Sequence, residues 1–190
     1  MKKTILLLAV VFAFSFSANA QESKAYLGVS VGVAFPGGDT ENLETGLSLG
    51  LVNFGYRFNE SWGAVLNWGS SGHNLKEGSG TFGIGYLAIG PMYTVDLNEK
   101  VSLDIKPQYA FRMAAETDGA GASDDFTSYG SGMLLGTSFN FGVSKGFKFS
   151  INLDYLSGTF DEEEYEGQTY DTEDFDVTCL SIGAGVRYNF

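Results

Sequence analysis

Several residue types are scarce in this 190-residue chain, and each scarcity narrows what the protein can be. A single cysteine, Cys179, excludes an intramolecular disulfide, and we expect a small buried side chain there rather than a nucleophile. A single histidine, His73, leaves most hydrolase mechanisms without a second candidate for the base. The 11 basic residues are outnumbered by 23 acids, which gives a net charge of −12 and disfavours nucleic acid as a partner.

Long apolar runs are confined to the first 20 residues. A run from Ile5 to Phe16 follows two lysines and precedes the small-x-small sequence at positions 18–20. This pattern predicts a secretory signal peptide over residues 1–20, cleaved after Ala20, and leaves residues 21–190 as one domain. A membrane-anchor helix is the alternative, but the run is short for a span of about 20 residues.

Glycine and aromatic residues are abundant instead. The chain has 26 glycines, 16 phenylalanines and 10 tyrosines, with only 3 prolines. Glycine is usually depleted in strands, so a β protein rich in both types needs a special reason. Small barrels supply one, because glycine relieves crowding on the inner face while aromatic residues form girdles outside.

The last eleven residues, Leu180–Phe190, alternate strictly between apolar and small or polar side chains. Neighbouring side chains of a strand point to opposite faces, so this segment predicts a strand with one apolar face. A soluble protein rarely leaves such an edge and a terminal Phe exposed. An outer-membrane barrel can, because its last strand pairs with its first and the Phe lies at the membrane interface.

Seven other segments alternate in a similar way. The chain is therefore predicted to be all-β, an eight-stranded antiparallel up-and-down transmembrane β-barrel, with a soluble β-sandwich as the alternative. A bulge is expected in the second strand at residues 52–54, and in the fourth the outward face is expected to change from Phe82, Ile84 and Tyr86 to Leu87, Ile89 and Tyr93. The predicted strands are Tyr26–Phe35, Gly46–Phe58, Trp62–Ser70, Gly80–Val95, Val101–Met113, Tyr129–Val143, Phe147–Thr159 and Leu180–Phe190.

The segment Val101–Met113 indicates which face is inside. Seven apolar residues, ending in Phe111 and Met113, alternate with a face that carries Asp104, Lys106 and Arg112. This pattern fits lipid outside and a polar lumen, whereas a soluble lipocalin would show the reverse. Because eight strands enclose just enough room for their own side chains, we expect a salt-bridged plug rather than a pore. The charged residues expected in the lumen are Arg57, Lys106, Arg112, Lys148 and Arg187 with Asp104 and Asp154.

The connections alternate in length. Residues 59–61, 96–100 and 144–146 are short turns, whereas residues 36–45, 71–79, 114–128 and 160–174 are longer and polar. Short periplasmic turns and long extracellular loops are typical of outer-membrane barrels, so both ends of the chain are expected in the periplasm.

With these features the chain resembles the small eight-stranded outer-membrane barrels, namely the OmpX-like proteins and the transmembrane domain of OmpA. The resemblance covers about Ala25 to Phe190 and includes the turn Arg57–Trp62 and the ending Val186–Phe190. It implies that the barrel assembly machinery reads Tyr188 and Phe190. The family's roles are diverse, and include structural support, adhesion, serum resistance and occasional small pores.

His73 raises the question of enzymatic activity, because two small barrel enzymes that modify lipid A use His with Ser and an acid. Ser70, Ser71 and Glu77 lie close to His73 in the sequence. A polar loop cannot by itself hold a nucleophile, a base and an acid within hydrogen-bond reach, so we expect a solvated loop histidine. The sequence thus predicts no catalytic, cofactor-binding or metal site.

Acidic residues are densest in Asp161–Glu166, followed by Asp171, Glu173 and Asp174. Ca²⁺ favours clustered oxygen ligands, but the spacing of an EF-hand loop is absent, so we expect a solvated, mobile acidic loop. The segment Asp118–Asp125 is acidic and rich in glycine, and no Lys-Ser/Thr follows its glycines to bind a phosphate.

The sequence therefore predicts a monomeric, non-enzymatic outer-membrane protein with a structural or adhesion-type role. Its expected partners are outer-membrane lipid and lipopolysaccharide, the assembly machinery, and a possible extracellular ligand of the acidic loops. A narrow passive channel and, less favoured, a lipid A-modifying enzyme are the alternatives.

Overall fold

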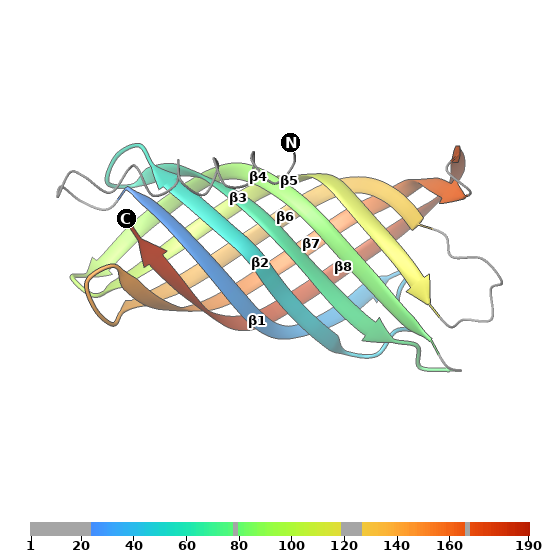
Figure 1. Ribbon diagram of the computed structural model, residues 1–190, viewed down its shortest axis with the longest axis horizontal. Coiled ribbons are helices and arrows are strands. Elements are labelled where there is room, and N and C mark those ends of the chain that lie inside the picture. The colour runs from blue at the N-terminus through green and yellow to red at the C-terminus, as the bar shows by residue number, and fades with distance from the viewer. Residues whose placement is uncertain (1–23, 78–79, 119–126, 166–167) are drawn as a thin grey trace, which may run out of the picture.

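The chain forms eight antiparallel strands joined in sequence order, as a computed structural model shows (Figure 1). The structure describes residues 24–77, 80–118, 127–165 and 168–190, so the predicted signal peptide lies outside the described residues. The strands are β1 (Ala25–Gly38), β2 (Gly46–Arg57), β3 (Trp62–Asn74), β4 (Thr81–Asn98), β5 (Val101–Asp118), β6 (Thr127–Gly142), β7 (Phe147–Tyr165) and β8 (Gln168–Asn189).

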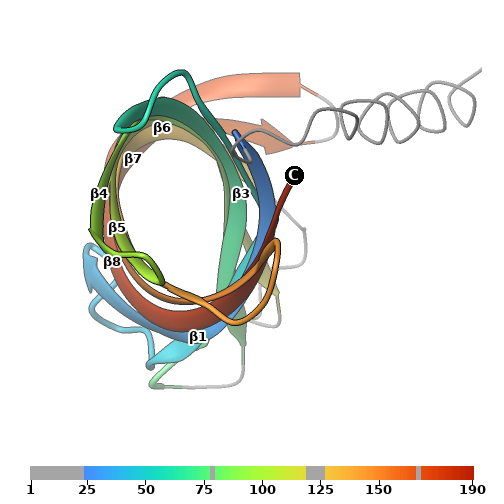
Figure 2. The same ribbon diagram turned by 90° about the vertical axis from the view of Figure 1, so that its left-hand side faces the viewer.

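The strands close into a barrel because β1 pairs with β8 (Figure 2). The ladder begins with hydrogen bonds that Ala25 and Phe190 exchange, and it continues to the pair Gly38 and Val177. The backbones approach closely at Gly32 and Gly183, where a Cβ on Gly32 would lie 2.6 Å from the Cα of Gly183. A closed ring has no free sheet edge around its middle, so the β-sandwich alternative is wrong.

The barrel has two different ends. The turns after β2, β4 and β6 are short, and we call that side the short-turn end; the connections after β1, β3, β5 and β7 define the opposite, long-strand end. Ala25 and Phe190 lie at the short-turn end, as predicted (Figure 1). No helix among the described residues is long and apolar enough to cross a membrane.

The outer face of the barrel is apolar. Val29 and Ile105 are 52% and 37% exposed. Aromatic residues are added toward the short-turn end, where the ring centres of Trp62 and Tyr93 lie 4.9 Å apart. In the short-turn halves of the strands, small and polar residues face inward, including Asp104 and Lys106. The polarity is therefore that of a membrane barrel and not of a lipocalin.

A bulge in β5 overturns part of the predicted pattern. Ala110 pairs with Ala88 and Gly132, but the next pairs are Arg112 with Leu87 and Met113 with Gly130, so β5 holds one extra residue at this point. An extra residue inverts the alternation above it. Met113, predicted to face outward, is completely buried, and Arg112, predicted to line the lumen, is exposed outside. The predicted bulge in β2 is present, but its register shift lies between Gly50 and Val52, just before the predicted residues 52–54.

The predicted change of face in β4 is wrong. Ile84 is buried in the barrel interior, with Phe82 and Tyr86 packed against the same cluster, and the inward face continues through Ala88 to Met92. The outward positions opposite them are Gly83 and Gly85. The prediction failed because it assumed that apolar residues always face lipid, whereas the lumen itself is apolar at this height.

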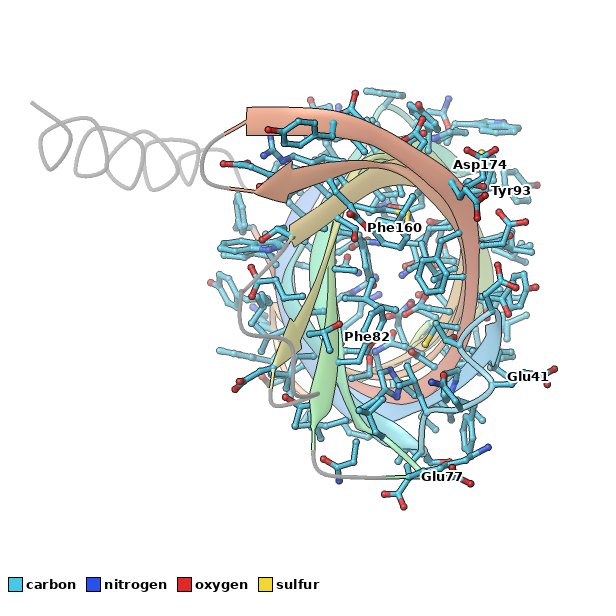
Figure 3. All side chains as sticks on the ribbon, turned by 90° about the vertical axis from the view of Figure 1, so that its right-hand side faces the viewer. Glu41, Glu77, Phe82, Tyr93, Phe160 and Asp174 are labelled. Carbon is cyan, nitrogen blue, oxygen red and sulfur yellow. The ribbon has the colours of Figure 1, made fainter. Side chains whose placement is uncertain are left out.

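Apolar residues fill the lumen toward the long-strand end. They form one buried cluster, which Phe82, Tyr86 and Phe175 complete (Figure 3). This long-strand-end core consists of Ala34, Ile84, Ala88, Ala110, Met113, Ala115, Leu134, Leu156, Phe160, Val177 and Cys179. The expected burial of Cys179 is confirmed.

Several strands also run farther than the sequence indicated. β3 ends at Asn74 rather than Ser70, and most of the loop predicted over residues 160–174 is a continuation of β7 and β8. In this extension Glu162 pairs with Asp171 and Glu163 with Tyr170. The backbone ladder outweighs the repulsion between acids because exposed charges are screened by water and salt.

Candidate functional site

The short-turn half of the lumen is filled by a polar network around a buried ion pair. Arg187 donates to Asp104 at 2.5 Å, and both side chains are almost completely buried. Asp104 also accepts from Thr94 at 2.8 Å and from Asn140 at 3.0 Å, while the Arg187 guanidinium lies 4.3 Å from the centre of the Tyr26 ring. A paired and hydrogen-bonded charge is the form in which ions are tolerated in such an interior.

A second chain of hydrogen bonds crosses the lumen beside this pair. Lys106, only 1% exposed, donates to Ser138 at 2.7 Å, and Ser138 donates to Asn152 at 2.7 Å. Asn67 donates to Gln108 at 2.9 Å. These contacts lie in the middle of the barrel, on the short-turn side of the long-strand-end core.

Not every charge predicted for the lumen belongs to this network. Asp154 faces the lumen near Lys106, and one of its oxygens is buried without a hydrogen-bond partner. Arg57 and Lys148 lie at the short-turn mouth. Arg112 is on the outer surface, where its guanidinium lies 5.2 Å from the centre of the Tyr129 ring.

His73 is not a solvated loop residue, so that prediction is wrong. It faces inward near the end of β3 and is only 2% exposed. Its Nδ1 lies 3.0 Å from the backbone oxygen of Glu44, and its Nε2 lies 3.0 Å from the hydroxyl of Ser71. Because β3 continues past Ser70, strand geometry places Ser71 and His73 on the same face.

These contacts do not assemble a serine hydrolase site. Ser70 points to the opposite face of β3, and Glu77 is exposed in the turn that follows β3 (Figure 3). The atom that orients His73 is a backbone carbonyl, so the ring pins the β1–β2 connection to β3. Among the described residues, no group of three or more His, Cys, Asp or Glu side chains could hold a metal ion.

The acidic extension of β7 and β8, residues 161–165 and 168–176, lies at the long-strand end of the barrel (Figure 1). β1 pairs with β8 no farther than Val177 within the described residues, and β6 covers β7 as far as Glu164. Asp161, Glu162, Glu173 and Asp174 are exposed there. Most of the acidic segment Asp118–Asp125 lies outside the described residues.

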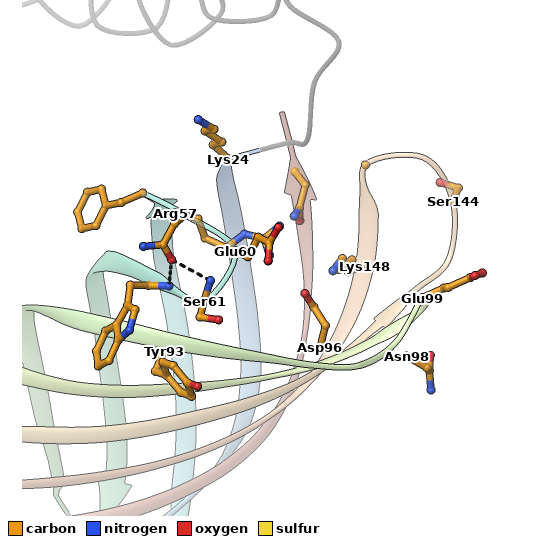
Figure 4. A pocket seen from close by; sticks show the side chains of 15 residues that line it. Lys24, Arg57, Glu60, Ser61, Tyr93, Asp96, Asn98, Glu99, Ser144 and Lys148 are labelled. Atoms are coloured by element: carbon orange, nitrogen blue, oxygen red, sulfur yellow. Dashed lines mark hydrogen bonds between the residues drawn. The ribbon is translucent and has the colours of Figure 1, made fainter.

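The short-turn mouth contains a cavity that sequence reasoning did not predict. Its volume is about 970 Å³, and its lining combines Lys24, Arg57 and Lys148 with Glu60, Asp96 and Glu99 (Figure 4). Asn59 shapes one wall, because its side chain accepts from the backbone N–H groups of Ser61 and Trp62. We call this cavity the vestibule. The lining comes from five separate segments of the chain, so no local sequence motif predicts it.

Comparisons with known proteins agree with this architecture. Neisserial surface protein A is 18% identical, with 87% of this chain and 97% of that chain covered and a TM-score of 0.59. Ail, the attachment invasion locus protein of Yersinia pestis, is 18% identical over 88% of this chain and all of that one, with a TM-score of 0.51. Ail in complex with the heparin analogue sucrose octasulfate is 17% identical, with 88% of this chain and 100% of that chain covered and a TM-score of 0.52. No curated protein matches the chain in sequence.

At these identities the solved structures establish the fold alone. The family model for the outer membrane protein beta-barrel domain, however, matches residues 5–190, which is nearly the whole sequence. The closed ring of eight antiparallel strands and the apolar outer face have the form that this family requires. The chain therefore belongs to the outer membrane β-barrel family, and its place is the outer membrane.

Proposed function

We propose that the protein is a non-enzymatic surface protein whose β7–β8 extension binds an extracellular partner. The observation that carries this proposal is the upper part of β8, which continues beyond its ladder with β1 and beyond the two hydrogen bonds that join Asp39 to Asp176. A strand edge with unpaired N–H and C=O groups can accept a further strand from another chain. Since long connections are extracellular in outer-membrane barrels, the extension faces the cell's surroundings.

The charge of the extension indicates the chemistry of the partner. Its exposed acids include Glu162, Glu173 and Asp174, and the sequence from Asp161 to Asp176 has no lysine or arginine. A basic, extended polypeptide segment would gain both main-chain hydrogen bonds and charge complementarity. A sulfated ligand such as the one bound to Ail would be repelled here.

The test is adhesion with matched charge variants. Cells that display the triple variant Glu162→Gln/Glu173→Gln/Asp174→Asn should adhere several-fold less to immobilised host matrix proteins than cells with the original chain. The control is the double variant Glu41→Gln/Glu77→Gln, which removes exposed acids at the same end but away from the extension. Equal adhesion of all three strains would refute the proposal.

We propose that the lumen is closed to ions, against the alternative of a passive channel. Support comes from the ion pair of Arg187 and Asp104 at one height and from buried Leu134, Leu156 and Phe160 at another. Two barriers in series predict that Asp104→Asn alone does not open the barrel. Planar-bilayer recordings that show discrete conductance for the original protein would overturn this assignment.

We also propose that residues 1–20 are a cleaved signal peptide and that Tyr188 and Phe190 are read by the barrel assembly machinery. Tyr188 is exposed on the lipid side, and its ring lies 6.3 Å from that of Phe190. Phe190→Ala should lower the amount of protein in the outer membrane. Normal abundance and normal heat-modifiable mobility on gels would contradict this role. We further propose that the barrel is a monomer surrounded by outer-membrane lipid and lipopolysaccharide.

A further inference from the structure

All three prolines of the chain lie in strands, and two of them face each other in the wall of the barrel. Pro91 in β4 and Pro107 in β5 are both exposed on the outer face. Tyr93 of β4 pairs with Ile105 of β5 in an antiparallel ladder. Pro91 precedes Tyr93 by two residues and Pro107 follows Ile105 by two, so the two prolines stand directly opposite each other.

The N–H groups that proline lacks would have pointed across the seam between β4 and β5. In an antiparallel pair, the N–H and C=O of a residue point to the same neighbouring strand, and the direction alternates along the chain. The N–H of Thr94 donates to Ser61 on the β3 side, so the odd-numbered residues before Thr94 point to β5. The carbonyl of Lys100 accepts from Gly142 on the β6 side, so the odd-numbered residues at the start of β5 point to β4. The two prolines therefore share one rung of the ladder, and both of its hydrogen bonds are lost.

The loss leaves a gap in the ladder. Both strands are described throughout, and within them residues 90–92 have no pairing with residues 106–108. The rungs on either side of the gap are four residues, or about 13 Å, apart. Neither proline carbonyl can receive an N–H across this rung, and hydrocarbon offers no water in its place. The backbones are nevertheless in contact, since a Cβ on Gly90 would collide with the carbonyl oxygen of Pro107.

The β4–β5 seam is also the most interrupted seam of the described barrel. In addition to the gap, its register shifts between Leu87 and Ala88 and again near Asp96. Each of the other seams has at most one shift among the described residues. The β1–β8 seam, which closes the ring, runs from Tyr26 to Gly38 without any shift. Local opening of a folded protein is easiest where backbone hydrogen bonds are few, which favours the β4–β5 seam.

Side-chain hydrogen bonds inside the lumen join the two sides of this seam. Asn67 on β3 donates to Gln108 on β5 at 2.9 Å, on the inner side of β4. Thr94 on β4 donates to Asp104 on β5 at 2.8 Å, nearer the short turns. Met92 and Gln108 are each 1% exposed, so the lumen directly behind the gap is packed. A separation of β4 from β5 would break these side-chain bonds, so they hold the seam closed.

We propose that the β4–β5 seam is the built-in opening point of the folded barrel, held closed by Asn67 and Gln108 where the backbone ladder is missing. Opening there exposes the polar lumen to the side of the barrel, whereas the seam between the first and last strands stays closed. The seam is distinct from the acidic extension of β7 and β8, so the proposal is independent of the proposed surface interaction.

The experiment is residue-resolved hydrogen exchange by NMR, on isotopically labelled protein purified from outer membranes and placed in lipid nanodiscs. The amides of Ile89 and Tyr93 point to β5, and those of Gly90 and Met92 on the same strand point to β3. After correction for intrinsic rates, the first two should exchange about tenfold faster or more, as expected for the loss of two neighbouring hydrogen bonds.

Two variants change the seam in opposite directions. Pro91→Ala/Pro107→Ala restores both donors of the missing rung, so the difference between the two sets of amides should disappear. Gln108→Leu keeps a similar volume but removes the acceptor for Asn67, so the difference should increase severalfold. Because the comparison is made within one strand, a change in global stability does not by itself alter the difference.

The matched control is Pro36→Ala. Ala25 donates to Phe190, so odd-numbered residues of β1 point to β8, and the nitrogen of Pro36 points away from it. The β1–β2 pairing ends at Ala34, so the restored N–H has no ladder partner and exchange in β4 should not change. Heat-modifiable gel mobility verifies that each variant is folded. Equal protection of both sets of amides in the original protein would overturn the proposal. So would the same difference in the folded double proline variant, or faster exchange in the middle of the β1–β8 seam than in the β4–β5 seam.

Discussion

The two halves of the lumen solve the same packing problem with different chemistry. Toward the short turns, Asp104, Lys106 and Arg187 are buried as a hydrogen-bonded network. Toward the long strands, Leu134 and Phe160 are buried among other apolar side chains. The polar half depends on each partner being present, whereas the apolar half depends on volume. Substitutions in the polar half should therefore destabilise by leaving a charge unpaired, and substitutions in the apolar half by leaving a cavity.

The largest effect is expected from Asp104→Leu. It leaves Arg187 buried without its counter-ion, which should cost about 3–5 kcal/mol of unfolding free energy. The double variant Asp104→Leu/Arg187→Met should recover most of that loss, because no unpaired charge remains. Urea titrations of protein folded into lipid vesicles measure both values. A double variant no more stable than Asp104→Leu would show that the loss of the ion pair, and not the burial of an unpaired Arg187, causes the destabilisation.

Leu134→Ala tests the apolar half. Leu134 is 1% exposed in the long-strand-end core, so its truncation should leave a cavity and cost about 2–5 kcal/mol. Its neighbour Leu135 faces outward, where lipid can fill the space that a smaller side chain leaves. Leu135→Ala should therefore cost clearly less in the same vesicle titration. Equal losses would mean that the core is loosely packed.

Ile105→Arg tests the distinction between inside and outside. Ile105 lies on the lipid-facing side of β5, where a cation near the bilayer midplane costs about 2–4 kcal/mol. Val143→Arg changes the same face at the short-turn end, where the cost should fall to about 0–1 kcal/mol. Similar unfolding free energies for the two variants would show that Ile105 lies no deeper in the hydrocarbon region of the membrane than Val143.

The smallest effect is expected from Arg112→Ala. The bulge in β5 places Arg112 outside, and the substitution loses its contact with the Tyr129 ring, worth about 0.5–1 kcal/mol at an exposed site. A loss comparable with that of Asp104→Leu would return Arg112 to the lumen and remove the bulge. Cysteine labelling at position 112 with a membrane-impermeant reagent provides a second readout on whole cells.

The same division explains what could be predicted from the sequence. Strand number, strand order and the short-turn halves of the strands follow from alternation, because there the lumen is mostly polar, apart from Tyr26, Val65 and Met92, and the lipid is apolar. Toward the long-strand end both the lumen and the lipid are apolar, so the sequence could not show which way Phe82 and Ile84 point. In β5 one extra residue near Phe111 exchanges the faces of Arg112 and Met113, and the alternation pattern gave no sign of it.

The candidate sites were less predictable than the fold. Ser71 and His73 were recognised as neighbours, but their burial depends on the backbone carbonyl of Glu44, which no pattern in the sequence marks. The vestibule is lined by Lys24, by Asn189 and by residues of three turns, so it exists only after the barrel has closed. The acids of the extension were recognised correctly, although the backbone ladder beneath them was not.

The close approach of Gly32 and Gly183 has a consequence for how the ring is completed. Along the β1–β8 seam the inward positions are mostly glycine, serine or alanine, so its closure restricts few side-chain rotamers and costs little conformational entropy. The larger inward residues are Tyr26, Asn189, Cys179, Val177 and Arg187, of which Arg187 alone is charged, and a slip of one residue would turn its charge into lipid. The seam thus combines a low ordering cost with a single charged residue that accepts only one register.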